Sequence, residues 1–397
     1  MAKLSITDLD LQGKRVFIRV DFNVPMKDGT ITNDMRMQAS LPTIRYALDH
    51  GALVVLASHL GRPKGKPNPE FSLRPVADHL AKLLDRPVAF ATDCVGDPAK
   101  QAVEQARTSG GGVVLLENLR FHPEEEKNDA AFAAQLADLA DLYVNDAFGS
   151  SHRAHASVDA LPRRMKRPAA GFLMHSEIKY LGEALASPTR PFVAILGGAK
   201  VSDKIEVIEN LLGRVDALAI GGAMAYTFLK SRGVPIGRSL VEDDKLDAAR
   251  LILEHAATRS VNLRLPTDHV VTTKIEPGAA GDVLPIPDAA IGDRIGVDIG
   301  PLTVRDYTQL VASAKTVVWN GPMGVFEVPP FDAGTTAIAR AVADVKGMTI
   351  VGGGDSVAAV AHAGVSDRIT HISTGGGASL ELLGGRTLPG VEALADR

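Results

Sequence analysis

The sequence contains very few cysteine and aromatic residues. Cys94 is the only cysteine among 397 residues, so an intramolecular disulfide is excluded and a reducing compartment is expected. Aromatic residues make up 5% of the chain, with a single tryptophan. A hydrophobic core must therefore be built mainly from valine, leucine, isoleucine and alanine.

Long apolar segments and a strong charge imbalance are also missing. The longest apolar runs, such as 52–57 and 113–116, are far shorter than the roughly 20 residues that a membrane-spanning helix needs. Residues 1–10 alternate apolar with polar or acidic residues and lack the apolar region of a secretory signal. The net charge of −4 does not favour nucleic-acid binding. We therefore expect a soluble cytoplasmic protein that binds neither membranes nor nucleic acids.

Both halves of the chain repeat a short β-rich run, a loop with glycine or charge, and a helical segment. The strands predicted in the first half are 16–20, 53–57, 88–90, 113–116 and 142–144. Those predicted in the second half are 192–196, 217–220, 270–273, 316–319, 349–351 and 371–373. Strands that alternate with helices indicate parallel, doubly wound sheets.

We therefore predict an α/β fold of two doubly wound, parallel-sheet (Rossmann-like) domains with an active-site cleft between them. The predicted domains are 1–172 and 188–374, and a helix at 173–187 joins them. A length of 397 residues agrees with two or three domains. The predicted helices include 72–84, with Ser72 as its N-cap, and 129–140.

The centre of the chain has the pattern of an anion site. Gly197 and Gly198 follow an apolar run and precede a segment, 204–212, whose apolar residues repeat at helical spacing. Paired glycines let the backbone approach a ligand, and a helix start offers free N–H groups to an anion. Lys200 and Lys204 add two positive charges. A helix cap with solvated lysines remains an alternative, because the Walker A spacing is absent.

Basic residues in the first half fall just after predicted strands. Because ligands bind outside the carboxyl ends of parallel strands, these side chains are expected to converge at one sheet edge. The residues are Arg36, His59, Arg62, Arg120 and Arg153. Arginine offers a planar fork to carboxylate and phosphate groups, so we predict a site for a small polyanion.

The corresponding loops of the second half carry glycine instead of arginine, at 197–198, 221–222, 352–354 and 375–377. Such loops let backbone N–H groups face phosphates. Asp355 follows the third of these loops and is either a helix N-cap or a Mg²⁺ ligand beside bound phosphates. Glu327 is either a ribose contact or an ordinary turn residue. Together the two halves predict group transfer between a small polyanion and a nucleotide.

Seven segments, taken together and in order, closely resemble the phosphoglycerate kinase family. They are Arg19-Val20-Asp21-Phe22-Asn23-Val24-Pro25, His59-Leu60-Gly61-Arg62-Pro63, Glu117-Asn118-Leu119-Arg120-Phe121, His152-Arg153-Ala154-His155, Gly197-Gly198-Ala199-Lys200, Asn320-Gly321-Pro322-Met323-Gly324 and Gly352-Gly353-Gly354-Asp355. The resemblance spans essentially the whole chain. It implies reversible phosphoryl transfer between 1,3-bisphosphoglycerate and ADP, which gives 3-phosphoglycerate and ATP, with Mg²⁺ as cofactor.

The resemblance also implies roles for individual residues. Those implied for 3-phosphoglycerate are Asp21, Phe22, Asn23, Arg36, His59, Leu60, Gly61, Arg62, Arg120 and Arg153. Those implied for the nucleotide are Gly198, Lys200, Lys204, Gly222, Glu327, Gly353, Gly354, Asp355 and Ser356. The implied catalytic residues are Arg36, Lys200 and Gly376, and the implied metal ligand is Asp355. The family also packs its C-terminal tail, here about 375–397, back onto the N-terminal domain.

The chain departs from the family pattern at three places, namely Ala223, Ser356 and 384–386. Ser356 keeps the hydroxyl of the expected threonine, whereas the other two touch the nucleotide loop and the tail. A two-lobed anion-binding protein without catalysis remains an alternative function. A nicotinamide dehydrogenase is not favoured, because no G-x-G-x-x-G spacing occurs. We further expect a monomer whose domains close by hinge bending.

Overall fold

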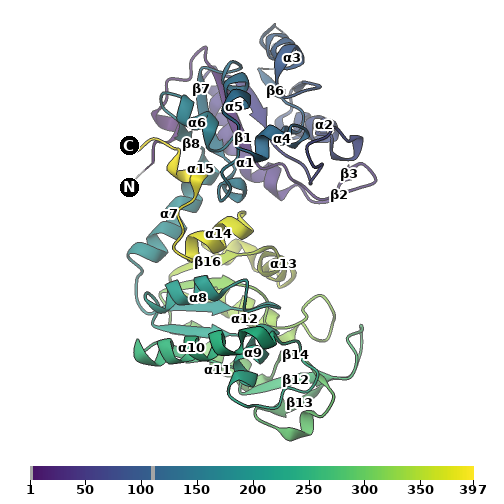
Figure 1. Cartoon of the computed structure of the whole chain (residues 1–397), viewed down its shortest axis with the longest axis vertical. Helices are drawn as coiled ribbons and strands as arrows, with labels where there is room; N and C mark the ends of the chain where they lie inside the picture. Colours follow the sequence, from purple (N-terminus) through teal and green to yellow (C-terminus); the bar gives the residue numbers. More distant parts are fainter. Residues whose placement is uncertain (1–2, 109–111) are drawn as a thin grey trace. The chain divides into compact units, whose positions relative to one another are not determined.

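A computed structural model describes residues 3–108 and 112–397, which form two compact units (Figure 1). Unit 1 comprises Met1–Lys179 and Thr387–Arg397, and unit 2 comprises Tyr180–Arg386. The division falls within one helix, α7 (Phe172–Ala186). Each unit contains its own parallel sheet, so the predicted α/β class with two parallel sheets is confirmed.

The sheet of unit 1 has six parallel strands in the order β5-β6-β4-β1-β7-β8. They are β1 (Arg15–Val20), β4 (Leu53–Ala57), β5 (Ala89–Phe90), β6 (Val113–Leu115), β7 (Leu142–Asp146) and β8 (Ala169–Ala170). Phe17 in β1 pairs with Val55 on one side and with Tyr143 on the other. Because all six strands run the same way, the loops at their carboxyl ends open on one edge of the sheet.

Helices cover this sheet and complete its core. They are α1 (Met35–Asp49), α2 (Arg74–Leu84), α3 (Gly96–Thr108), α4 (Pro123–Glu126), α5 (Ala130–Ala137), α6 (Ala160–Arg164), the start of α7, and α15 (Pro389–Glu392). Ile18 and Leu56 of the sheet share one buried cluster with Met37 of α1 and Leu80 of α2. A small hairpin, β2 (Met26–Lys27) and β3 (Thr30–Ile31), was not predicted from the sequence.

The helices predicted at 129–140 and 72–84 differ in how their N-terminal ends are capped. Asp129 caps α5, since its carboxylate accepts a hydrogen bond from Phe132 N at 2.8 Å. Ser72 is not the N-cap of α2, because the cap position is Leu73. The Ser72 hydroxyl instead donates to Glu117 Oε2 at 2.7 Å, which ties the start of this helix to the loop after β6.

The last residues of the chain pack onto the N-terminal part of unit 1, and Figure 1 shows both chain ends beside α15. Leu4 N donates to Ala395 O at 2.8 Å, and Lys3 forms an ion pair with Asp396 at 2.9 Å. Gly390 N donates to Ser151 O at 2.9 Å. By contrast, α14 (Gly376–Leu383) lies in unit 2.

The main sheet of unit 2 also has six parallel strands, in the order β11-β10-β9-β15-β16-β17. They are β9 (Phe192–Leu196), β10 (Ala217–Ile220), β11 (Asn262–Arg264), β15 (Thr316–Asn320), β16 (Met348–Gly352) and β17 (His371–Ile372). The helices are the end of α7, α8 (Ile205–Leu212), α9 (Met224–Ser231), α10 (Leu246–Thr258), α11 (Pro301–Ala312), α12 (Ala333–Asp344), α13 (Gly354–His362) and α14. Trp319 in β15 is fully buried in the core of this unit.

One predicted strand belongs to a different sheet from the one expected. Residues 270–273 were assigned to the parallel sheet, but β12 (Asp268–Thr272) lies between β13 (Asp282–Pro285) and β14 (Ile295–Ile299) in a separate antiparallel sheet. A short apolar run has the same composition in either kind of sheet, so the run itself cannot identify its partners. This small sheet forms one wall of the pocket described below.

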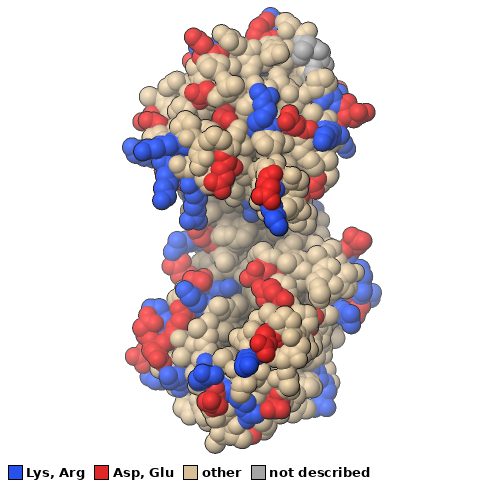
Figure 2. Space-filling view, turned by 90° about the vertical axis from the view of Figure 1, so that its right-hand side faces the viewer, with Lys and Arg blue, Asp and Glu red and all other residues tan. Residues whose placement is uncertain are grey.

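Two surface properties bear on function. Among the described residues, no helix combines the length and the apolar character needed to cross a bilayer. On the face drawn in Figure 2, basic and acidic side chains are interspersed over both units and do not form one large field of a single sign.

Candidate functional site

In unit 1, the loop after β1 holds Arg36 in place. Arg36 is the second residue of α1, and its Nη1 lies 3.2 Å from Asp21 Oδ1 and 3.1 Å from the carbonyl oxygen of Asn23. The aspartate carboxylate therefore neutralises and orients this guanidinium. The guanidinium is still partly exposed, with 38% of its side chain accessible.

The loops after β1, β4 and β6 are bonded to one another. Gly61 N donates to Asn23 Oδ1 at 2.9 Å, and Arg120 Nη1 donates to Gly61 O at 3.0 Å. The side chains of Phe22 and Leu60 lie in the hydrophobic core. Any ligand contact of these two residues must therefore come from the backbone.

Several cations of this sheet edge interact through space. Burial, together with the charges of Arg19, Arg120 and Arg36, holds the pKa of His59 well below its usual value. The pKa of His155 falls to about 3 for the same reasons, with burial first and Arg120 next. Both imidazoles are therefore neutral near pH 7. Positive charges that lie this close repel one another, and a bound anion relieves this repulsion.

Arg120 is the most constrained arginine of this group. Burial lowers its pKa to about 10, and Arg19 and Arg153 add to the effect. Its Nε lies 3.5 Å from Glu126 Oε1 and has no hydrogen-bond partner within the described part of the chain. A buried guanidinium N–H without an acceptor is costly, so this atom favours an incoming anion.

The two remaining predicted arginines differ from each other. Arg153 is exposed, yet its charge is felt by both Arg120 and His155, so it belongs to the same electrostatic group. Arg62 is exposed and forms no hydrogen bond or ion pair with any described residue. The structure therefore brings Arg36, His59, Arg120 and Arg153 together and gives no such evidence for Arg62.

The prediction missed Arg19, which is 1% exposed and underlies this group. Its Nη2 lies 3.1 Å from His59 Nδ1, and its Nε donates to Ser157 Oγ at 2.9 Å. Glu125, also buried, accepts hydrogen bonds from the Ser157 backbone and hydroxyl. A charged residue inside an otherwise apolar strand was the available signal, because such a residue needs a partner.

In unit 2, the glycine turns after β9 and β10 press closely against other backbone segments. Gly198 N donates to Pro322 O, and Gly222 N donates to Met323 O, at 2.9 and 3.0 Å. Gly222 has a φ of +65°, and a Cβ there would lie 2.5 Å from Gly198 N. Only glycine fits at this contact.

The two lysines near these turns have different surroundings. Lys204 is 9% exposed and lies next to Gly198, since a Cβ on that glycine would be 3.4 Å from Lys204 Nζ. Burial lowers the pKa of Lys204, while Asp203 and Asp355 oppose this effect. Lys204 is thus no solvated surface lysine. Lys200 is exposed and has no hydrogen bond or ion pair among the described residues.

The loop after β16 leads into α13. Gly353 is the N-cap, so the helix-cap interpretation of Asp355 is wrong; Asp355 is the second residue of the helix and is exposed. The buried Ser356 hydroxyl accepts a hydrogen bond from Gly321 N at 2.5 Å. Gly354 begins α13, and Gly376 similarly begins α14.

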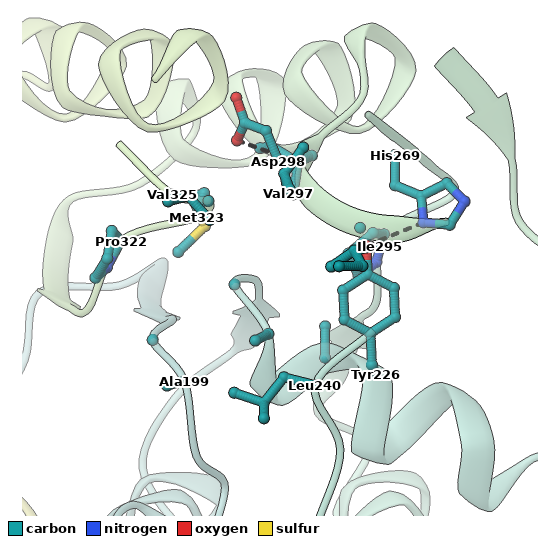
Figure 3. A pocket seen from close by; sticks show the side chains of 18 of the residues that line it. Ala199, Tyr226, Leu240, His269, Ile295, Val297, Asp298, Pro322, Met323 and Val325 are labelled. Atoms are coloured by element: carbon teal, nitrogen blue, oxygen red, sulfur yellow. Dashed lines mark hydrogen bonds between the residues drawn. The ribbon is translucent and has the colours of Figure 1, made fainter. Parts of the chain in front are cut away.

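A pocket of about 280 Å³ lies beside these loops (Figure 3). Its walls are mainly apolar and come from α9, the antiparallel sheet and the segment after β15, with Tyr226, Ile295 and Met323 among them. Gly198, Gly222, Glu327 and Asp355 also line it. The apolar lining suits a largely apolar group whose polar end reaches the glycine turns.

The pocket wall contains a hydrogen-bonded tyrosine–histidine pair and a buried carboxylate. Tyr226 Oη lies 3.0 Å from His269 Nδ1, as the dashed line in Figure 3 marks. The carboxylate of Asp298 accepts hydrogen bonds from Gly334 N at 2.7 Å and Ile299 N at 2.9 Å. Burial nevertheless raises the pKa of Asp298 to about 7. The prediction missed all three residues, which lie far apart in the sequence.

Comparison with known proteins agrees with this arrangement. The model of the family described as phosphoglycerate kinase matches residues 6–386. The chain belongs to the phosphoglycerate kinase family. The phosphoglycerate kinase of Solibacter usitatus is 62% identical over 99% of this chain and 100% of its own length. That of Acidobacterium capsulatum is 58% identical, with 100% of both chains covered.

Solved phosphoglycerate kinase structures are also similar. The enzyme from Coxiella burnetii has 43% identity and a TM-score of 0.88, and the match covers 98% of each chain. The enzyme from Pyrococcus horikoshii has 34% identity and a TM-score of 0.83 over the same shares. Because the matches to phosphoglycerate kinases include both units, an anion-binding protein without catalysis is not favoured.

The departures from the phosphoglycerate kinase pattern fit their surroundings. Ala223 occupies the N-cap of α9 with an ordinary helical φ of −65°, so its methyl group causes no backbone strain. Gly385 has a φ of +80° beside Asn210, and Arg386 forms an exposed ion pair with Glu206 at 2.6 Å. The segment that holds these last residues is anchored to α8, since Asn210 Nδ2 donates to Leu383 O at 2.6 Å.

Proposed function

We propose that this protein catalyses the reversible transfer of a phosphoryl group from 1,3-bisphosphoglycerate to ADP, giving 3-phosphoglycerate and ATP. The observation that carries the proposal is family membership over both units, each with a site of suitable chemistry. Unit 1 has a cationic sheet edge, and unit 2 has glycine turns beside an apolar pocket.

We assign the 3-phosphoglycerate site to the sheet edge of unit 1. Arg36, Arg120 and Arg153 bind the anionic groups, and neutral His59 offers a hydrogen bond without adding charge. Asp21 and Asn23 position Arg36 and the Gly61 loop through the bonds described above. Arg62 is retained in this set on the family pattern alone.

We assign the nucleotide to the pocket of unit 2, with the base against its apolar wall and Glu327 on the ribose. The phosphates lie along Gly198, Gly222 and the start of α13, near Lys200 and Lys204. Asp355 offers one exposed carboxylate, which would suit Mg²⁺. Mg²⁺ is usually bound by one or two carboxylates together with substrate phosphates and water. When bound there, Mg²⁺ supplies positive charge that offsets the charge of the phosphates.

The reaction requires no general base, because the acceptor is an ionised phosphate in one direction and an ionised carboxylate in the other. It requires in-line alignment and cancellation of charge on the transferred group. Arg36 and Lys200 supply that charge, and the backbone N–H of Gly376 at the start of α14 adds a donor. The low pKa values of His59 and His155 are in keeping with a mechanism without proton transfer.

Transfer also requires that water be kept from the reacting phosphates. We propose that the protein acts as a cytoplasmic monomer and closes when both substrates are bound. The bends are assigned near Phe172, near Ser187-Pro188 and near 374–377.

Incubation with 3-phosphoglycerate and Mg·ATP tests the proposal, with ADP release followed in a coupled assay. We expect ADP only when 3-phosphoglycerate is present, which distinguishes transfer from ATP hydrolysis. Calorimetric binding of 3-phosphoglycerate without any ADP release would instead identify an anion-binding protein and refute the proposal.

A further inference from the structure

A second group of potential ligands lies in unit 1, formed by residues that the proposed reaction does not use. The ligand atoms of Asp93, Cys94 and His122 all lie within 4.8 Å of one another. His122 Nε2 is 2.7 Å from Asp93 Oδ1, and Cys94 is fully buried beside them. Thiol, imidazole and carboxylate are the three side-chain groups that most often bind zinc.

The three residues come from two loops that the sheet brings together. Asp93 and Cys94 lie between β5 and α3, and His122 follows the turn that ends at Phe121. The Asp93 carboxylate is already oriented, since its Oδ1 accepts a hydrogen bond from Cys94 N at 2.6 Å. His122 is held by stacking on Phe132, with ring centroids 5.2 Å apart. Little rearrangement is therefore needed to converge on one ion.

The distances are compatible with a tetrahedral ion. Metal–ligand bonds of roughly 2.0–2.3 Å place neighbouring ligand atoms roughly 3.3–3.6 Å apart. The 2.7 Å pair must therefore open slightly, and the sulfur must approach by at most roughly 1.2–1.5 Å from the upper limit of 4.8 Å. A cavity of about 460 Å³, lined by Asp93, His122 and Glu117, adjoins the cluster and leaves room for water as a fourth ligand.

The local charge favours a cation. Burial first, and then the charges of Asp93 and Glu125, raise the pKa of the Cys94 thiol. The hydrogen bond to Asp93 raises the pKa of His122, and the charge of Glu124 adds to this effect. The carboxylates of Asp93, Glu124 and Glu125 therefore all act on the cluster. A thiolate among the ligands selects zinc-like ions over Mg²⁺, which prefers oxygen.

We propose that Asp93, Cys94 and His122 form a binding site for one thiolate-preferring divalent cation such as Zn²⁺. On binding, His122 coordinates through Nε2 as a neutral imidazole with its proton on Nδ1, and any second ring proton and the Cys94 thiol proton are released to solvent. The bound ion joins the loop after β5 to the segment that follows Arg120. This site is independent of the phosphoryl transfer proposed above.

Cobalt(II) titration of the metal-free full-length protein tests the site. A thiolate bound to Co²⁺ gives a charge-transfer absorption band, and Cys94 is the only thiol in the chain. We expect this band to saturate at one equivalent of Co²⁺ and to disappear when Zn²⁺ is added. Zn²⁺ is also expected to raise the melting temperature of the protein, because it binds the folded state.

Variants identify the ligands. Cys94→Ser should abolish the band, and His122→Gln should weaken Co²⁺ binding at least about 10-fold, the lower limit seen for losing even an outer partner of a metal site. His79→Gln is the matched control, since His79 forms a similar pair with Asp34 at 2.8 Å but belongs to no group of potential metal ligands among the described residues. It should leave the band unchanged.

The test does not depend on whether Cys94→Ser, the variant at the buried position, folds. If Cys94→Ser does not fold, His122→Gln and His79→Gln decide the assignment, because both side chains are partly exposed. No charge-transfer band in the unmodified protein would overturn the proposal. Unchanged Co²⁺ affinity in His122→Gln would overturn it as well.

Discussion

Replacing Gly222 by alanine should disturb the nucleotide loops of unit 2 and leave unit 1 unaffected. An added Cβ would lie 2.5 Å from Gly198 N and 2.8 Å from Pro322 O. Both neighbours are backbone atoms, so rotation of a side chain cannot relieve the contact. Either the turn at 197–198 or the segment at 321–322 must move.

The expected loss of stability has two parts. Alanine at the φ of +65° found at Gly222 costs about 1–2 kcal/mol relative to an ordinary conformation. Overpacking against neighbours that cannot yield adds about 1–3 kcal/mol. We therefore expect the free energy of unfolding of unit 2 to fall by about 2–5 kcal/mol. Misplacing the phosphate-facing turn should also lower kcat/KM for ADP by on the order of 10²-fold.

Urea unfolding followed by tryptophan fluorescence measures the first effect. Trp319 is the only tryptophan, it is fully buried in β15, and its Nε1 donates to Gly321 O at 2.8 Å. Its emission therefore reports on unit 2 and on the segment that Gly222 contacts. Steady-state kinetics with varied ADP measures the second effect.

Gly233→Ala provides the matched control in the same unit. Gly233 has a φ of +78°, but a Cβ there would meet no atom within 4 Å. This variant should show only the backbone cost and normal kinetics with ADP. If both variants lose the same stability, the close contact at Gly222 is not what requires glycine, and the reasoning fails.

Four further predictions concern the proposed reaction. Lys200→Ala should lower kcat by about 10²-fold, the scale for losing one preorganised donor; a raised nucleotide KM with normal kcat would contradict a transition-state role. Arg120→Ala and Arg153→Ala should raise the KM for 3-phosphoglycerate and spare that for ATP, with Arg62→Ala tested in parallel; a weakened ATP interaction would reverse the assignment of the units. Asp355→Asn should shift the Mg²⁺ dependence of the rate to higher concentration, whereas an unchanged titration would remove Asp355 as a metal ligand. Small-angle X-ray scattering should give a smaller radius of gyration with both substrates than with either alone, and equal values would exclude closure by both ligands.

Most of the parallel strands could be predicted because they are short apolar runs between helical segments. Phe192–Leu196 is buried along its whole length, as expected for the interior of a covered sheet. The strand at 268–272 was assigned to the wrong sheet because its antiparallel partners, β13 and β14, were not among the predicted strands. A short apolar run has the same composition in either kind of sheet, so its partners depend on tertiary packing.

The candidate site shows the same limit. Arg120 after β6 and Arg153 after β7, which the structure brings together, could be predicted from the rule that loops at the carboxyl ends of parallel strands converge. Arg19 stands out as a charged residue in an apolar strand, but its partners His59 and Ser157 could not be predicted, since they lie in segments far apart in the chain. The walls of the nucleotide pocket are likewise formed by residues from separate elements, none of which carries a local motif.

The return of the C-terminus to unit 1 has a consequence for how the protein is made. Unit 2 is one continuous stretch, so it can fold as soon as Arg386 has left the ribosome. Unit 1 cannot be completed then, because Leu4 N still lacks its acceptor, Ala395 O, and Ser151 O still lacks its donor, Gly390 N. The first-synthesised half of the chain is thus the last to be finished. A chain truncated after Arg386 should hold a folded unit 2 and a unit 1 that is open at its N-terminal edge.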